Sequence, residues 1–141
     1  MRFVLDNSVS MCWLEPPLKP GDASYAVKVL KALTEAQALV PSLWALEAAN
    51  VISKLESRGA ITEARTQGFI ALLGRLNIVE DVATAKHALG ETLNLARRFK
   101  LSSYDAAYLE LALRSGLAIA TLDANLAKAA KKAGVLLYPA N

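Results

Sequence analysis

Short apolar runs alternate along this chain with longer segments in which apolar residues recur every three or four positions. Such alternation is typical of strands that each lead into a helix, as in a parallel sheet built from βαβ units. The apolar runs predict strands at Arg2–Leu5, Ala38–Val40, Asn77–Glu80, Ala118–Thr121 and Val135–Tyr138. The periodic segments predict helices at Asp22–Glu35, Leu43–Ser57, Glu63–Leu76, Ala83–Arg98, Tyr104–Ser115 and Ala124–Ala133. The pattern therefore predicts an α/β fold with a short, mainly parallel sheet flanked by helices.

Residues at the expected helix ends agree with this interpretation. The expected N-cap residues are Ser42, Thr62 and Ser102 or Ser103, and the glycines that follow helix ends are Gly59, Gly116 and Gly134. Only residues 58–62 separate the second and third helices, which predicts a helical hairpin. The length of 141 residues suits a single domain that spans residues 1–141.

The composition favours a soluble protein. Hydrophobic residues make up 54% of the chain, yet no uncharged apolar run is long enough to cross a membrane. Asp6 interrupts the N-terminus before any signal-like apolar region, and the single cysteine, Cys12, fits a reducing compartment. We therefore expect a cytoplasmic protein with no membrane contact. The net charge of +3 suits a polyanionic partner but does not identify one.

Four acidic residues carry most of the chemical information. Asp6 and Asp123 each follow an apolar run, Asp105 opens an expected helix, and Glu47 lies inside another. Parallel sheets form their sites beyond the carboxyl ends of the strands, so these acids are expected to converge. Taken singly, each has an ordinary interpretation as a turn residue, a solvated acid or a helix cap. Taken together, clustered acids without matching bases indicate a divalent cation, Mg²⁺ or Mn²⁺.

Residue types narrow the possible reactions. The chain has no glycine-rich phosphate loop, and the single histidine, His87, and the single cysteine leave little material for other catalytic sites. A cation held by carboxylates can polarise a phosphoryl oxygen and activate water, which favours phosphodiester hydrolysis. A receiver-type phosphotransfer domain is a weaker alternative. Asn7 rather than a second acid follows Asp6, and no lysine follows the last expected strand.

Longer motifs resemble a known family. The segment Leu101 to Ala112, with Tyr-Asp-Ala-Ala-Tyr at its centre, resembles the third acidic motif of PIN-domain ribonucleases. Thr121-Leu122-Asp123 follows in the expected order. The opening residues Val4 to Ser8 resemble the first motif, and Glu47 with Asn50 resembles the family's Glu-x-x-Asn helix. The resemblance covers essentially the whole chain and implies a three-layer PIN-like fold.

A free-standing chain of this length is similar to the VapC toxins of toxin–antitoxin pairs. The resemblance implies a Mg²⁺- or Mn²⁺-dependent endoribonuclease, usually a homodimer, that cuts RNA and is restrained by a VapB-type antitoxin. It implies that Asp6, Glu47, Asp105 and Asp123 are the catalytic, metal-binding acids. The implied polar support comes from Ser8, Thr121 and Asn125, and Asn50 shares a helix face with Glu47 and could orient it. A non-catalytic RNA-binding PIN scaffold is the alternative function.

Two further groups of residues suggest interaction surfaces. Basic residues that could guide RNA phosphates, or could simply be solvated, are Arg97, Arg98, Lys100, Lys128, Lys131 and Lys132. Apolar residues expected to form a surface for a second copy or an antitoxin helix are Trp13, Leu14, Trp44, Phe69, Leu72 and Leu73.

Overall fold

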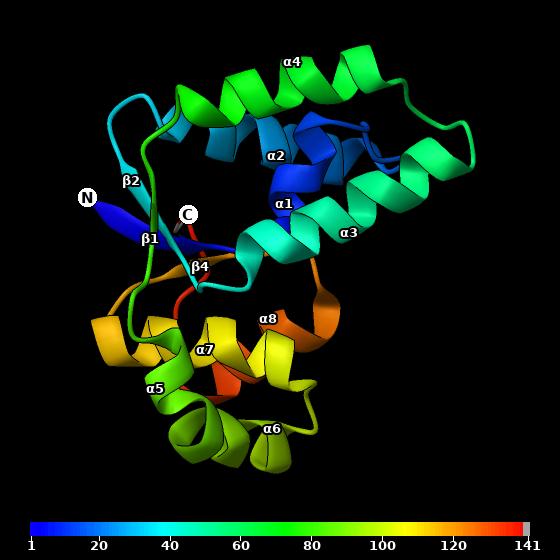
Figure 1. Ribbon diagram of the computed structural model, residues 1–141. Coiled ribbons are helices and arrows are strands. Elements are labelled where there is room, and N and C mark those ends of the chain that lie inside the picture. The colour runs from blue at the N-terminus through cyan, green and yellow to red at the C-terminus, as the bar shows by residue number, and fades with distance from the viewer. Residues whose placement is uncertain (140–141) are drawn as a thin grey trace.

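A four-stranded parallel sheet lies between two layers of helices in the computed structural model, which describes residues 1–139 (Figure 1). Strand β1 (Arg2–Leu5) pairs with a neighbour on each side, through Phe3 with Ala38 of β2 (Gln37–Val40) and through Leu5 with Ala120 of β4 (Ile119–Ala120). The α/β class and the three-layer arrangement that the sequence predicts are therefore confirmed. The order across the sheet is β3 (Ile78–Glu80), β2, β1 and β4.

The helices divide between the two faces of the sheet by sequence (Figure 1). The N-terminal layer contains α1 (Asn7–Ser10), the 3₁₀ helix η1 (Met11–Trp13), α2 (Pro20–Ala32), α3 (Trp44–Ser57) and α4 (Glu63–Gly74). The C-terminal layer contains α5 (Thr84–His87), the π-helical turn η2 (Ala88–Thr92), α6 (Leu93–Phe99), α7 (Ser103–Ser115) and α8 (Ala124–Lys132). The α3–α4 pair is the helical hairpin that the sequence predicts.

The core lies on both sides of β1. Phe3, Val4 and Leu5 have no exposed surface, which explains why this strand is a continuous apolar run rather than an alternating one. Helix α7 contributes the fully buried Tyr108 from the C-terminal layer. Because most of β1 and α7 is buried in the core, packing holds these two elements in place.

Several local predictions differ from the structure. The expected strand Val135–Tyr138 forms only one bridge, from Leu137 to Ile119, because its neighbour β4 is itself two residues long. The expected helix Ala83–Arg98 is broken at Gly90, whose backbone (φ −112°, ψ −106°) is not helical. Ser42 does not cap α3. Its N–H donates to Thr84 Oγ1 over 3.0 Å instead.

The apolar residues expected to form a partner surface mostly fill this chain's own interior. Leu14, Trp44 and Phe69 are buried, so the prediction is wrong for them. Leu14 and Phe69 pack with Leu55 in a small second cluster that holds the helical hairpin, and Trp13 and Leu73 lie at its edge. Leu72 is partly buried on α4. Within residues 1–139, no helix combines the length and the apolar character that a membrane span requires.

Candidate active site

Two neighbouring parallel strands bring the first part of the site together. Asp6 follows β1, and Thr121 follows β4, whose Ala120 carbonyl accepts the Asp6 N–H over 3.0 Å. The carboxyl ends of both strands lie at the same edge of the sheet, as the sequence predicts. Asp6 is only 5% exposed, so its carboxylate has lost most of its water.

Two hydroxyl groups fix the Asp6 carboxylate. Ser8 Oγ and Thr121 Oγ1 both donate to Asp6 Oδ2, over 2.5 Å and 2.8 Å. Each hydroxyl in turn accepts a backbone N–H, from Leu122 at 2.9 Å and from Asp123 at 3.0 Å. Ser8 and Thr121, which the sequence predicts as supporting residues, therefore hold the Asp6 carboxylate in place. Because both hydroxyls use the same oxygen, they leave Asp6 Oδ1 to other partners.

Helix starts carry the next two acids. Ser102 caps α7 by accepting the Asp105 N–H over 3.1 Å, which places Asp105 in the first turn. Asp123 is itself the N-cap of α8, and its Oδ1 accepts the Leu126 N–H over 2.9 Å. The ordinary capping role considered for Asp123 is thus real, and it occupies only one of the two carboxylate oxygens.

Glu47 reaches the site from the opposite layer of helices. It lies in the first turn of α3, and Tyr108 of α7 donates its hydroxyl to Glu47 Oε1 over 2.5 Å. Asn7 joins the same region, since its amide donates to the Trp44 carbonyl over 2.8 Å at the start of α3. Neither Tyr108 nor Asn7 was predicted from the sequence as a site residue. One available signal was that Tyr108 lies three residues after Asp105, on the same face of α7.

The electrostatics link all four acids. Burial, together with the charges of Asp123 and Asp6, raises the pKa of Asp105 to about 6, against a hydrogen bond from Ser102. Burial also raises the pKa of Asp6 despite the two hydroxyls, and the charges of Glu47 and Asp123 add to this. Burial raises the pKa of Glu47 too, opposed by Tyr108 and Asn7 and reinforced by Asp105. The charged forms of Asp6, Glu47 and Asp105 are therefore destabilised first by burial and then by neighbouring carboxylates.

A fifth acid at the same edge of the sheet shows the contrast. Asp81 follows β3, but Arg114 binds it with an N–O distance of 2.6 Å and also binds Glu110 over 2.8 Å. Burial opposes the charge of Asp81, yet Arg114, Thr84 and the Ala83 N–H together lower its pKa. Among residues 1–139, the salt bridges found involve only Arg114, so no arginine or lysine pairs with the site acids.

The remaining predicted residues lie at the periphery. Asn50 is exposed on α3 and lines a shallow pocket with Glu47, Leu46 and Tyr104, so it borders the site. No hydrogen bond from Asn50 to Glu47 is found among residues 1–139, and its orienting role is not supported. Asn125 is exposed in the first turn of α8, where it lines a different pocket.

The donor set suits a hard divalent cation in its chemistry. Carboxylate and hydroxyl oxygens are the ligands that Mg²⁺ and Mn²⁺ prefer, and a cation would relieve the repulsion that raises these pKa values. In the described part of the chain, however, no three His, Cys, Asp or Glu side chains are grouped so that they could hold one ion. Binding through one or two carboxylates and several waters, which is usual for Mg²⁺, fits these residues.

Comparison with known proteins identifies the family. The sequence model of the PIN domain family matches residues 4–132, most of the chain, including all four acids. The chain belongs to the PIN domain family. PIN domains are generally nucleases and typically use divalent metal ions. This membership leaves the receiver-type alternative without support.

The fold of this PIN domain agrees with a solved structure. The crystal structure of PAE2754 from Pyrobaculum aerophilum superposes with a TM-score of 0.68 at 23% sequence identity, over 96% of this chain and 83% of that one. At this identity the likeness concerns the fold alone. No curated protein has significant sequence similarity to the chain.

Proposed function

We propose that this PIN domain is a Mg²⁺- or Mn²⁺-dependent endoribonuclease that acts as the VapC-type toxin of a toxin–antitoxin pair. The observation that carries the proposal is a group of acids without a basic partner in the described residues. Burial and neighbouring carboxylates raise the pKa values of Asp6, Glu47 and Asp105, and the charge of Asp123 adds to the rise at Asp6 and Asp105. A divalent cation at these acids would polarise the phosphoryl oxygen and activate water.

The chain's own residues have distinct tasks in this proposal. Asp6 is held in place by Ser8 and Thr121 and offers Oδ1 to the cation. Asp105 lies in the first turn of α7, where the helix amides favour the charged form and fix its position. Tyr108 orients Glu47 by hydrogen bonding to Oε1 and leaves Oε2 to a ligand or water.

The first test is RNA cleavage by purified protein in Mg²⁺, in Mn²⁺ and after EDTA treatment. We expect cleavage with either metal, none in EDTA, and recovery when the metal is restored. By family resemblance, the products should have 5′-phosphate and 3′-hydroxyl ends. Full activity in EDTA would contradict the metal mechanism, and a 2′,3′-cyclic phosphate would identify the ribose hydroxyl as the nucleophile.

The same assay addresses the alternative of a non-catalytic RNA-binding scaffold. That alternative is favoured by the lack of any three grouped metal-ligating side chains in residues 1–139. RNA binding without cleavage in either metal, by protein shown to be folded, would support the scaffold.

A further inference from the structure

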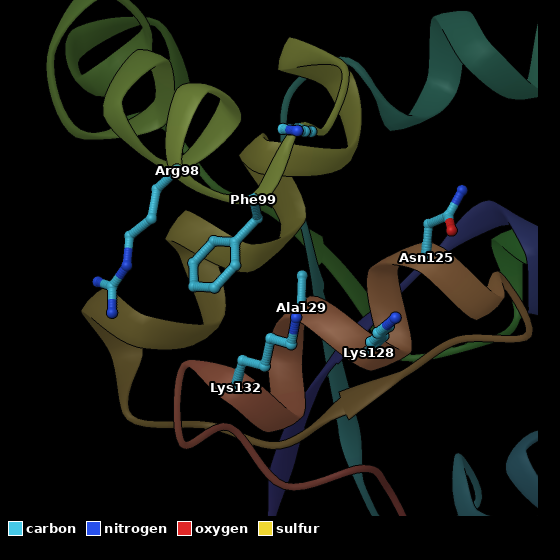
Figure 2. A pocket seen from close by; sticks show the side chains of 7 residues that line it. Arg98, Phe99, Asn125, Lys128, Ala129 and Lys132 are labelled. Atoms are coloured by element: carbon cyan, nitrogen blue, oxygen red, sulfur yellow. The ribbon is translucent and has the colours of Figure 1, made fainter.

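A basic pocket of about 410 Å³ lies between the end of α6 and one face of α8. Figure 2 shows Arg98 and Phe99 on one wall, with Asn125, Lys128 and Lys132 along α8 on the other. Lys100, just after α6, completes a set of four cationic side chains around the opening. No acidic side chain of residues 1–139 lines this pocket.

Each wall of the pocket is joined along the chain to one of the four acids. Helix α6 ends at Phe99 and leads through Lys100 into α7, which carries Asp105. Helix α8 begins directly after Asp123, so Asn125 lies within one turn of that acid. Asp105 and Asp123 therefore lie within five and two residues of the pocket-lining Lys100 and Asn125.

The face of α8 that lines the pocket carries a regular row of polar side chains. Asn125, Lys128 and Lys132 follow one another at intervals of three and four residues, which places them on one side of the helix. Lys128 and Lys132 are about 6 Å apart along the helix axis, since each residue rises about 1.5 Å. Lys131 lies on the same helix and is exposed, but it does not line the pocket.

Lys100 has an unusual backbone for its residue type. Its φ of 54° and ψ of 45° are left-handed, at a helix end where glycine is the favoured residue. A lysine in this left-handed conformation is less favourable than a glycine, but its side chain adds a cation to the pocket. Backbone strain of this kind is often retained where a side chain has a functional role.

The pocket cations have no acidic partners. None of the four forms a salt bridge among residues 1–139. Arg98 lies over the Phe99 ring at 4.9 Å from its centroid, which holds the guanidinium in place without neutralising it. Four like charges around one pocket repel one another, and a polyanion would relieve that repulsion and release its own counterions.

We propose that this pocket binds the phosphodiester backbone of the RNA strand, next to the linkage that lies at the four acids. Lys128 and Lys132 contact successive phosphates, while Arg98 and Lys100 contact the strand from the opposite wall. This assignment rests on the proposed ribonuclease function, for which it supplies the substrate-positioning surface.

The test compares two double variants that each remove two positive charges. Lys128→Gln with Lys132→Gln alters the pocket, whereas Lys31→Gln with Lys54→Gln alters exposed lysines outside it. Binding of a labelled single-stranded RNA is measured in EDTA, where cleavage is not expected, over a range of salt concentrations. We expect the salt slope of log K for the pocket variant to fall by about 1.4, since each phosphate contact contributes about 0.7 for a single strand. The control variant should keep the parent slope.

Lys100→Gly provides a separate readout. Glycine suits the left-handed backbone, so the variant should unfold at the same or a higher temperature than the parent and should bind RNA more weakly. Unchanged RNA affinity would remove Lys100 from the proposed surface.

The outcomes separate this inference from the ribonuclease proposal. Equal slopes for the two double variants, or no RNA binding by the parent, would overturn the pocket assignment even if the protein cleaves RNA in Mg²⁺. A slope that falls only for the pocket variant, in a protein that never cleaves, would support the pocket and contradict the nuclease. An equal fall with a DNA duplex of the same length would reveal a general polyanion site and would overturn the assignment to the substrate strand.

Discussion

At the scale of single residues, the site is defined by acids whose charges are poorly compensated. The same edge of the sheet contains Asp81, which is neutralised by Arg114, and Asp6, which is not. Burial raises the pKa of Asp105 to about 6, with further contributions from Asp123 and Asp6. A carboxylate with a raised pKa destabilises the folded state at neutral pH, and this links the site to stability.

Asp105→Asn should therefore stabilise the metal-free protein at pH 7.5, by about 1 kcal/mol. The rise of about two pKa units corresponds to about 3 kcal/mol. Solvent screening of this partly exposed carboxylate and loss of the favourable acid at the helix start reduce the net gain. The unfolded pKa of Asp105 is near 3.8, so the penalty is complete above the folded pKa of about 6 and fades as the pH falls toward 4. Urea unfolding in EDTA at pH 7.5 and pH 4.5 measures this difference.

The variant should also lose its response to metal. Mg²⁺ should raise the thermal midpoint of the parent more than that of Asp105→Asn, and RNA cleavage should fall by orders of magnitude. If Asp105→Asn is less stable than the parent in EDTA at pH 7.5, Asp105 is a structural helix-start residue. Normal cleavage by the variant would remove it from the active site.

Site residues differ in how far the sequence could predict them. Asp6 and Asp123 each follow an apolar run, and the parallel topology then places both at one edge of the sheet. Tyr108 and Asn7 could not be found in this way, because their contacts join helices that are far apart in the sequence. The bond from Tyr108 to Glu47 spans 61 positions in the sequence and depends on how α3 and α7 pack.

At the scale of elements, helix ends decide much of the local stability. Helix α7 ends at Gly116 in a left-handed conformation, with φ of 65°. Gly68, by contrast, lies inside α4 with ordinary helical geometry. A Cβ atom at either position would meet nothing within 4 Å, so the backbone alone determines the effect of adding one.

Gly116→Ala and Gly68→Ala should change stability in opposite directions. Alanine at Gly116 must adopt the left-handed conformation, which should destabilise the protein by about 1 kcal/mol. Alanine at Gly68 should stabilise it by about 0.5–1 kcal/mol through helix propensity and reduced unfolded-state entropy. Chemical denaturation of both variants measures the difference, and RNA cleavage should be unchanged in each. Equal effects of the same sign would refute the backbone explanation.

The elements that the sequence predicts most accurately are those whose bounds depend on neighbouring residues in the sequence rather than on tertiary packing. The apolar run of β1 predicts its bounds correctly, Arg2–Leu5, and Thr62 caps α4 as expected, since it accepts the Arg65 N–H over 3.1 Å. The C-terminal strand was predicted too long because its pairing depends on how much of β4 is available. The short helix α1 was missed because four residues are too few to show a helical period.

At the scale of the whole molecule, the exposed apolar side chains are not those that the sequence suggested. Leu46 is 75% exposed and Tyr104 is 60% exposed, and both line the shallow pocket beside Glu47. Apolar side chains exposed next to a functional site are typical of a binding surface. Under the toxin proposal, we expect these two side chains to contact a VapB-type antitoxin or a second copy.

The toxin proposal predicts a growth phenotype. Induced production of the parent protein in bacteria should arrest growth, because cleavage of cellular RNA stops translation, whereas Asp105→Asn should not. Co-production of a small antitoxin-like protein encoded beside the gene should restore growth and should co-purify with the parent. Leu46→Glu should weaken the co-purification of the antitoxin with the parent protein. Lys86→Glu changes an exposed residue of α5 and is the matched control, which should leave the co-purification unchanged. Arrest by Asp105→Asn as strong as by the parent would contradict toxicity through cleavage.

The orientation of the Ser8 and Thr121 hydroxyl groups beside Asp6 affects how a substrate can approach. Ser8 and Thr121 each have one proton, and both protons point to the same carboxylate oxygen. Each hydroxyl also receives one backbone N–H, so what remains on either oxygen is a lone pair. Toward an incoming phosphate this corner therefore presents only electron pairs and negative charge. A bare phosphate oxygen finds no donor from either hydroxyl, and the proposed cation would supply the missing positive charge between the two.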